Sequence, residues 1–210
     1  MHMNNLITIL DYGMGNLGSV QNMLKFLDIK SVITSDLAEI GKAHKLIIAG
    51  VGAFDSGMTN LKNMNALELL NKKALEEKTP ILGICLGMQI FSKKSEEGTL
   101  PGLGWVKADT VKFKFPEGEA KNKIPHIGWN TVVPQRDDPL FFNFPAEIRF
   151  YFVHSYHLVC ENQQDILGST SHGYHFPSVI RQGNILGTQF HPEKSHKYGM
   201  QLLKNFCERV

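Results

Sequence analysis

The chain has only three cysteines among its 210 residues, Cys85, Cys160 and Cys207, and no two of them form a C-x-x-C pair. Such sparse cysteines indicate neither a disulfide framework nor a cysteine zinc site. The sequence also lacks an apolar run long enough to cross a bilayer and a basic, cleavable segment typical of secretory signals. We therefore expect a cytoplasmic protein without a membrane anchor.

Neither sign of charge is in excess, because 22 Lys and Arg residues stand against 20 Asp and Glu residues, for a net charge of +2. This balance does not support binding to nucleic acid or to an anionic membrane. Hydrophobic residues make up 42% of the chain, which is enough for a core and too many for a disordered protein. Because no repeat or linker divides the sequence, residues 1–210 are predicted to form one domain.

Short apolar runs alternate with helical periodicity in the first third of the chain, a pattern typical of βαβ units with a parallel sheet. The predicted strands there are residues 6–10, 32–34, 46–49 and 81–84, with helices at 17–27, 67–75 and from 86 to 91. Later strand-like segments predict antiparallel additions to the same sheet, at residues 109–115, 127–133, 150–159, 166–170, 179–181 and 185–190, before a helix near 195–207. The predicted fold class is α/β, a three-layer αβα sandwich with a mostly parallel central sheet and an antiparallel extension.

The strongest chemical signal lies between Ile81 and Gln89, where an apolar strand passes through G-x-C-x-G into a helix. This is the layout of a nucleophile elbow with Cys85 in place of a serine. Gly83 and Gly87 fit because such a sharp turn brings backbones too close for a Cβ atom. The positive end of the helix would favour the thiolate of Cys85. Taken alone, Cys85 fits a buried structural cysteine equally well.

A second signal is the sequence His191-Pro192-Glu193, at the end of the last apolar strand. Residues i and i+2 of an extended chain face the same side, and the proline biases His191 toward an extended backbone. A carboxylate of Glu193 that accepts the Nδ1 proton leaves Nε2 of His191 free to meet a thiol. We therefore predict a catalytic triad of Cys85, His191 and Glu193, although the cysteine and histidine lie far apart in the sequence.

Acyl transfer from an amide also needs donors for an oxyanion, each worth roughly 2.7–4 kcal/mol. One candidate is the N–H group of Leu86, directly after the predicted nucleophile. The loop at residues 49–52 follows a predicted parallel strand, so it should emerge at the same sheet edge as Cys85. Its glycines let a peptide turn an N–H group inward, which makes Val51 and Gly52 the other candidates. A plain tight turn is the alternative for this loop.

Six blocks of sequence, in order along the chain, resemble the class I (triad) glutamine amidotransferase family, in which Cys, His and Glu release ammonia from glutamine. Within it, the likeness is to the glutaminase subunits of imidazole glycerol phosphate synthase. The blocks are D-Y-G-M-G-N at 11–16, G-V-G-A-F at 50–54, G-I-C-L-G-M-Q at 83–89, P-H-I-G-W-N at 125–130, Y-F-V-H-S-Y at 151–156 and Q-F-H-P-E-K-S at 189–195. Each block alone is weak evidence, whereas six in order over nearly the whole chain are very specific.

The resemblance implies a glutamine thioester on Cys85, with His191 moving the protons and Glu193 steadying it. It implies no cofactor and no metal. The residues that it assigns to binding of L-glutamine are Gly52, Gln89, Ser155 and Tyr156.

The resemblance also implies a partner, since the family passes ammonia through a tunnel to a TIM-barrel synthase or cyclase subunit, as a heterodimer, in histidine biosynthesis. Asn16 and Tyr151 match family positions near the partner face. The family's oxyanion loop needs a flipped peptide before it works, and Gly50 and Gly52 suit such a switch. A poor glutaminase is therefore expected when the chain is alone.

Two positions depart from the family pattern, because Met14 and Ala49 stand where proline is usual. The run at residues 152–160, with His157, also resembles paralogous amidotransferases that supply ammonia for an acetamidino sugar in surface-polysaccharide pathways. The glutaminase chemistry is the same in both cases, and the acceptor of ammonia stays open.

Three further interpretations stay open at this point. G-x-G-x-x-G at residues 13–18, with Asp36 about twenty residues beyond, is a weak motif for a nucleotide-binding oxidoreductase. A non-catalytic binding subunit or a papain-like protease would also contain a cysteine and a histidine, although a binding subunit has no need of the H-x-E pair. No carboxylate stands at a ligand spacing from the remaining clustered histidines, which we expect at turns and on the surface, namely His154, His157, His172 and His175.

Overall fold

The computed structural model describes residues 6–116 and 123–210. Its strands are β1 (Ile7–Leu10), β2 (Ser31–Thr34), β3 (Leu46–Gly50), β4 (Ile81–Cys85), β5 (Ala108–Lys112), β6 (His126–Pro134), β7 (Ile148–His154), β8 (Tyr156–Cys160), β9 (Ile166–His172), β10 (Tyr174–Gln182) and β11 (Ile185–Thr188). Its helices are α1 (Leu17–Phe26), α2 (Leu37–Gly41), α3 (Phe54–Asn63), α4 (Leu67–Asn71), α5 (Leu86–Gln89) and α6 (His196–Arg209), with a π-helical turn η1 (Lys72–Glu76) and 3-10 turns η2 (Pro139–Phe141), η3 (Gln163–Asp165) and η4 (Pro192–Lys194).

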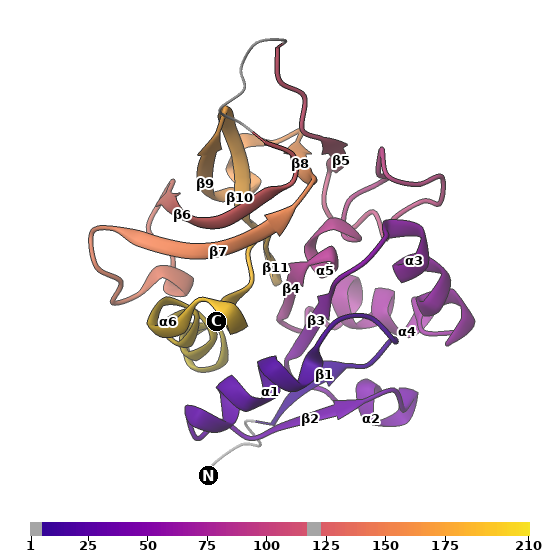
Figure 1. Cartoon of the computed structure of the whole chain (residues 1–210). Coiled ribbons are helices and arrows are strands. Elements are labelled where there is room, and N and C mark those ends of the chain that lie inside the picture. The colour runs from indigo at the N-terminus through magenta and orange to yellow at the C-terminus, as the bar shows by residue number, and fades with distance from the viewer. Residues whose placement is uncertain (1–5, 117–122) are drawn as a thin grey trace.

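In the described part of the chain, one nine-stranded mixed sheet runs through the molecule in the order β2-β1-β3-β4-β11-β10-β9-β6-β7. The first five strands in that order are parallel, and each later strand is antiparallel to its neighbour. The parallel half lies at the bottom of Figure 1 and the antiparallel half at the top. The sheet confirms the predicted α/β fold with an antiparallel extension.

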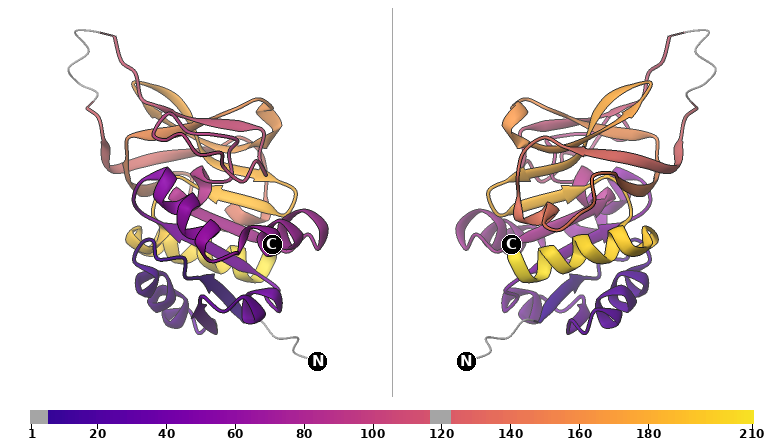
Figure 2. Two further views of the ribbon diagram at one scale, coloured as in Figure 1. Left: turned by 90° about the vertical axis from the view of Figure 1, so that its right-hand side faces the viewer. Right: turned by 90° about the vertical axis from the view of Figure 1, so that its left-hand side faces the viewer.

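Helices cover both faces of the parallel half (Figures 1 and 2). α1 and α6 lie on one face, where Leu24 and Phe206 join Ile9 in one buried cluster. α3 and α4 lie on the other face, where Phe54 packs with Ile48 in a second cluster. Strands covered on both sides must be apolar on both sides, which accounts for the continuous apolar runs in the first third of the sequence.

The prediction of a single strand at residues 150–159 is wrong, because the chain breaks at Ser155 into β7 and β8. β8 leaves the main sheet and pairs antiparallel with β5 in a separate two-stranded sheet, so the predicted strand at 109–115 does not extend the main sheet. Neither glycine nor proline marks this break in the sequence. It is held by His154, whose Nδ1 bonds the carbonyl oxygen of Tyr156 at 2.7 Å.

The helices also differ from their predicted positions. The sequence analysis missed α3, a helix that contains Gly57 and several polar residues and that buries only one side. The predicted helix at 67–75 divides into α4 and η1, and the helix predicted to begin at residues 86–91 is limited to Leu86–Gln89. Tertiary packing, not intrinsic propensity, decides such short elements.

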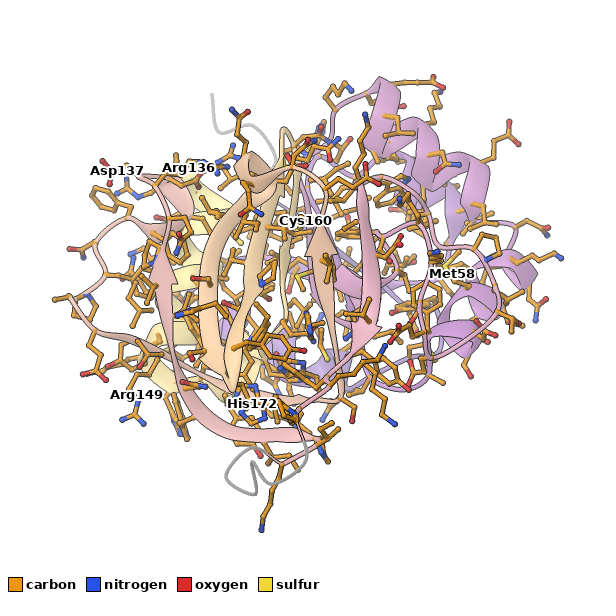
Figure 3. The ribbon with its side chains drawn as sticks, turned by 90° about the horizontal axis from the view of Figure 1, so that it is seen from above. Met58, Arg136, Asp137, Arg149, Cys160 and His172 are labelled. Carbon is orange, nitrogen blue, oxygen red and sulfur yellow. The ribbon has the colours of Figure 1, made fainter. Side chains whose placement is uncertain are left out.

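The two cysteines outside the elbow are buried, as expected for small apolar residues. Cys160 is 8% and Cys207 is 6% exposed, and burial raises the pKa of each thiol to about 12. Figure 3 shows Cys160 among the strands, whereas Arg149 lies at the edge of the molecule. Across the described ranges, no helix combines the length and the apolar composition that a membrane span needs.

Close backbone contacts fix the junction of β4 and α5. A Cβ atom at Gly87 would lie 1.7 Å from the carbonyl oxygen of Ile48 on β3, and a Cβ atom at Gly83 would lie 2.7 Å from the carbonyl group of Gly87. Backbone atoms at such distances cannot be moved aside as a flexible side chain can. The steric prediction made from the G-x-C-x-G spacing is therefore confirmed.

We predict that Gly87→Ala destabilises the chain by about 3 kcal/mol, because β3 and α5 must move apart to admit the methyl group. The matched control is Gly18→Ala in α1, where the new Cβ atom meets only the Oδ1 atom of Asn16, at 3.6 Å. That change should leave stability equal or slightly higher, since alanine favours a helix. Urea unfolding of both variants measures the difference, and a Gly87→Ala variant as stable as the parent would contradict the close packing.

Candidate active site

Cys85 ends β4 with φ 54° and ψ −109°, a backbone conformation that residues other than glycine rarely adopt. Such a residue stores strain of order 1–3 kcal/mol and persists only where its surroundings hold it. The contacts of Gly83 and Gly87 supply that restraint. They keep the thiol at the carboxyl edge of the parallel strands, where the side chain is 6% exposed.

His191 and Glu193 form a closely coupled pair at the same edge. Nδ1 of His191 lies 2.6 Å from Oε1 of Glu193. The His191 backbone is extended, with φ −102° and ψ 97°, as expected before Pro192. Its N–H donates to the carbonyl oxygen of Tyr151 at 2.9 Å, and the hydroxyl of Ser195 donates to its carbonyl oxygen at 2.6 Å. The backbone of His191 is thus fixed on both sides, and Glu193 orients its imidazole.

The electrostatics of His191 connect it to Cys85. Burial lowers the pKa of His191, but hydrogen bonding and negative charge from Cys85 and Glu193 raise it, and the resulting pKa is about 10. The strands place the two residues at the same edge, because β11 pairs with β4 with Thr188 opposite Ile84, and Gln189 donates to the Cys85 sulfur at 3.7 Å. Nε2 of His191 is buried and has no well-aligned hydrogen bond to any residue within 6–116 or 123–210. The raised pKa favours the protonated imidazole, which can give a proton to a leaving amine.

The predicted oxyanion loop lies beside the cysteine. Gly50, the last residue of β3, is the register partner of Cys85. Gly52 has φ +126°, which a side chain would strain, and Val51 between the two glycines is 43% exposed. Leu86 follows Cys85 directly and is buried. The structure therefore brings together the three predicted oxyanion residues and the predicted nucleophile at one sheet edge.

The sequence analysis missed Gln189, which is fully buried next to the cysteine. Its side-chain Nε2 lies 3.7 Å from the sulfur of Cys85, as a donor, and its Oε1 accepts from Nε2 of Gln89 at 3.1 Å. Nε2 of Gln89 also donates to the carbonyl oxygen of Tyr156 at 3.1 Å. Two glutamine side chains thus connect the thiol to the segment that contains Ser155 and Tyr156. The only sequence signal for Gln189 was its position two residues before His191.

A chain of buried side chains continues from Tyr156 into the antiparallel half. Nδ1 of His154 bonds the carbonyl oxygen of Tyr156 at 2.7 Å, Nε2 of His154 meets Nδ1 of His126 at 3.0 Å, and Nε2 of His126 meets Nδ2 of Asn130 at 3.1 Å. A carbonyl oxygen can only accept, so Nδ1 of His154 carries its proton and Nε2 accepts. The same reasoning puts the proton of His126 on Nδ1. Both imidazoles are therefore neutral.

Burial agrees with this assignment of protons. Burial holds the pKa of His154 well below its ordinary value and, with the nearby His172, lowers the pKa of His126 to about 4. The expectation that His154 and His157 lie at turns or on the surface is wrong, because they are 6% and 3% exposed and pack around Phe113. Aromatic packing and hydrogen bonds across strands decided their burial, and spacing in the sequence does not show either.

The predicted partner-face residues are accessible. Asn16 is exposed and caps α1, since its Oδ1 accepts from the N–H of Ser19 at 3.3 Å. Tyr151 on β7 is half-buried, and the 40% exposed Trp129 of β6 lies against it with ring centroids 6.4 Å apart. Trp129, which the sequence analysis did not single out, adds an exposed aromatic surface next to Tyr151.

The glycine-rich segment at residues 13–18 has a structural explanation without a nucleotide. Gly13 and Gly15 have φ values of +76° and +81°. A Cβ atom at Gly15 would lie 3.1 Å from Cα of Gly50 and 3.2 Å from the amide nitrogen of Val51, so this loop packs directly on the oxyanion loop. Asp36, the acidic residue of the motif, instead caps α2, with Oδ1 accepting from Ala38 at 2.8 Å.

We predict that Glu193→Gln slows glutamine hydrolysis by about 10²-fold and moves the alkaline limb of the pH–rate profile to lower pH. Glu193 raises the pKa of His191, so the protonated imidazole is lost only as the pH rises through about 10. Without the carboxylate that loss occurs at lower pH. Glu147→Gln, at a 70% exposed side chain, is the control. An unchanged alkaline limb in the Glu193 variant would show that this carboxylate does not tune His191.

We predict that His154→Phe raises the KM for glutamine about fivefold, because the Tyr156 carbonyl loses one of its two hydrogen bonds, worth about 1 kcal/mol. Phenylalanine keeps the aromatic packing around Phe113. Steady-state kinetics of the variant are compared with those of His175→Phe, at an exposed position of β10, which should match the parent. An unchanged KM in His154→Phe would show that His154 does not help to position the substrate.

Comparisons with known proteins place the chain in a family. Residues 8–210 match the family model described as Glutamine amidotransferase class-I. "Imidazole glycerol phosphate synthase subunit HisH 2" of Methanococcus maripaludis is 52% identical over 205 residues, 98% of this chain and 100% of that protein. The protein of the same name from Pseudomonas aeruginosa is 45% identical over 205 residues, with the same coverage.

Solved structures share the fold at lower identity. A chain in the structure of PurLQS from Thermotoga maritima has a TM-score of 0.71 and 17% identity, over 97% of this chain and 98% of that chain. A structure described as a glutamine amidotransferase has a TM-score of 0.73 and 18% identity, over 96% and 97% of the two chains. These structures show the fold alone, whereas the family model and the HisH relatives show that the chain belongs to the class I glutamine amidotransferase family and, within it, to the HisH subunits of imidazole glycerol phosphate synthase.

Proposed function

We propose that the chain is the glutaminase subunit of imidazole glycerol phosphate synthase, which hydrolyses L-glutamine to glutamate and ammonia. The observation that carries this proposal is the position of Cys85 in a strained elbow at the end of β4, next to the end of β11, where Glu193 holds the His191 imidazole at 2.6 Å. A cysteine beside a histidine that a carboxylate orients forms a thiol nucleophile with its base. The identity of 52% to a HisH protein supports the same substrate.

The proposed reaction begins when Nε2 of His191 holds the proton of the Cys85 thiol, and the resulting thiolate attacks the carboxamide carbon of glutamine. Negative charge then develops on the carboxamide oxygen, where the N–H groups of Leu86 and of the Val51–Gly52 segment would donate. Nε2 of His191 gives its proton to the departing nitrogen, which leaves as ammonia. Nε2 of His191, now neutral, then takes a proton from a water molecule, and the hydroxide attacks the thioester carbon, which releases glutamate and restores the Cys85 thiolate.

The substrate residues of this proposal are Gly52, Gln89, Ser155 and Tyr156. Gln89 is 5% exposed and its Nε2 donates to two acceptors, the Tyr156 carbonyl oxygen and Oε1 of Gln189, so it acts as a fixed wall of the site. Ser155 and Tyr156 lie at the break between β7 and β8, outside the main sheet. The Ser155 carbonyl oxygen accepts from the N–H of Phe113 at 3.0 Å, and the Tyr156 carbonyl oxygen is bonded by Gln89 and His154, so this segment is held in place beside Gln89.

The proposed partner is a TIM-barrel cyclase subunit that receives the ammonia as part of a heterodimer. The exposed Asn16, the half-buried Tyr151 and the exposed Trp129 are the surface residues that we assign to this interface. We further propose that residues 1–210 act as one domain and that the complex works in the cytoplasm, where phosphorylated biosynthetic intermediates are found.

A second acceptor of ammonia is favoured by one specific observation. Methanococcus maripaludis has proteins named HisH 1 and HisH 2, and this chain is 44% identical to the first and 52% identical to the second. A second copy in one organism fits a paralogue with a different barrel partner. The alternative proposal is therefore a glutaminase that supplies ammonia for an acetamidino sugar in surface-polysaccharide biosynthesis.

We predict that the isolated chain releases glutamate at least ten times more slowly than the chain bound to its cyclase subunit, because Gly50 and Gly52 allow an oxyanion loop that is not yet aligned. Glutamate release is measured with and without the cyclase of the same organism, with Cys85→Ala as the inactive control. Equal rates would show that the cyclase subunit does not align the oxyanion loop. Failure of the histidine-pathway cyclase to stimulate the chain or to use its ammonia would favour the sugar-pathway alternative.

A further inference from the structure

The Tyr12 hydroxyl is a buried polar group without a partner. Tyr12 is 2% exposed, and its hydroxyl has no hydrogen-bond partner among residues 6–116 and 123–210. Buried polar side-chain atoms nearly always have one, so each exception calls for a physical reason. The catalytic mechanism above makes no use of this group.

The hydroxyl lies directly under the predicted oxyanion loop. A Cβ atom at Gly50 would lie 2.1 Å from the Tyr12 oxygen and 3.3 Å from Cβ of Leu86. Gly50 must therefore be glycine for the hydroxyl to rest against its backbone. Gly50 belongs to one of the two backbone segments that we assign to the oxyanion, and Leu86 belongs to the other.

The tyrosine itself cannot move to find an acceptor. Nδ2 of Asn60 donates to the Tyr12 carbonyl oxygen at 2.9 Å. Cε2 of its ring would lie 3.6 Å from a Cβ atom at Gly57, next to Cδ2 of Leu86, so α3 and α5 enclose the ring. Burial raises the pKa of Tyr12, and negative charge on Cys85 raises it further, so the phenol stays a donor at working pH.

The oxyanion loop can move instead. Val51 is exposed, and the glycines on either side of it permit rotation of the intervening peptides without steric cost. Such a rotation reorients the carbonyl groups of the loop next to a donor that is already fixed and dehydrated. A donor kept unpaired in the resting state gains its full hydrogen bond only in the rotated state.

We propose that Tyr12 is a positioning residue of the oxyanion loop, whose hydroxyl donates to a backbone carbonyl within residues 49–51 when the loop takes its working conformation. This inference rests on the proposed glutaminase function. It assigns to Tyr12 no contact with glutamine and no transfer of a proton.

The test is Tyr12→Phe, which removes only the hydroxyl, measured in the complex with the cyclase subunit. We expect kcat for glutamate release to fall about tenfold with KM changed less than twofold. The thermal midpoint of the isolated chain should be equal or higher, because an unpaired buried hydroxyl has been removed. Tyr198→Phe, at a half-buried ring in α6, is the matched control and should leave both measurements unchanged.

Alkylation of Cys85 by iodoacetamide distinguishes an effect on the oxyanion loop from an effect on thiol reactivity, because this displacement forms no oxyanion. Its rate should be the same in Tyr12→Phe and the parent. A kcat within twofold of the parent would overturn the proposal, as would an alkylation rate that falls in parallel with kcat. A parent complex that released no glutamate would contradict the proposed function itself, whereas an active parent with an equally active variant would contradict only the role of Tyr12.

Discussion

The close contact between Gly87 and the Ile48 carbonyl is the constraint on which the site depends. It presses α5 onto β3, and the chain can make that turn only if Cys85 adopts a positive φ. The parallel register of β3 and β4 then sets Gly50 beside the cysteine, and β11 on the other side of β4 delivers the segment with Gln189 and His191. Three adjacent strands thus bring nucleophile, oxyanion loop and base to one edge, although their residues are far apart in the sequence.

Histidines in this molecule have opposite protonation states for identifiable reasons. His191 is buried, yet a carboxylate at 2.6 Å and the neighbouring thiol outweigh the cost of burying its charge. His126 and His154 have no carboxylate in their hydrogen-bonded chain, so burial dominates and both stay neutral. The first kind of histidine can move protons, whereas the second can only fix backbone groups such as the Tyr156 carbonyl. Residue type alone does not distinguish the two.

Local sequence was sufficient to predict the elbow, the H-x-E pair and the parallel half, because each depends on residues within one turn or strand. It was insufficient where long-range packing decides the structure. The break at Ser155, which carries β8 away from the main sheet, has no glycine or proline to mark it, and Gln189 looks like any strand residue until its side chain is seen beside Cys85. The burial of His154 and the unpaired hydroxyl of Tyr12 likewise depend on residues brought together only by folding.

The surface assigned to the partner contacts, through backbone atoms, both the predicted catalytic histidine and the predicted oxyanion loop. Tyr151 accepts the hydrogen bond from the His191 N–H, so the base is fixed to β7 through one backbone contact. The loop that ends at Asn16 packs through Gly15 on Gly50 and Val51, so the oxyanion loop contacts the same face. Because Cys85 and His191 are 6% and 2% exposed, glutamine reaches them only if part of this enclosure opens. The oxyanion loop is the part with glycine hinges and an exposed tip, and a protein bound over Asn16 and Tyr151 would therefore control access to the thiol and its alignment through the same few peptides.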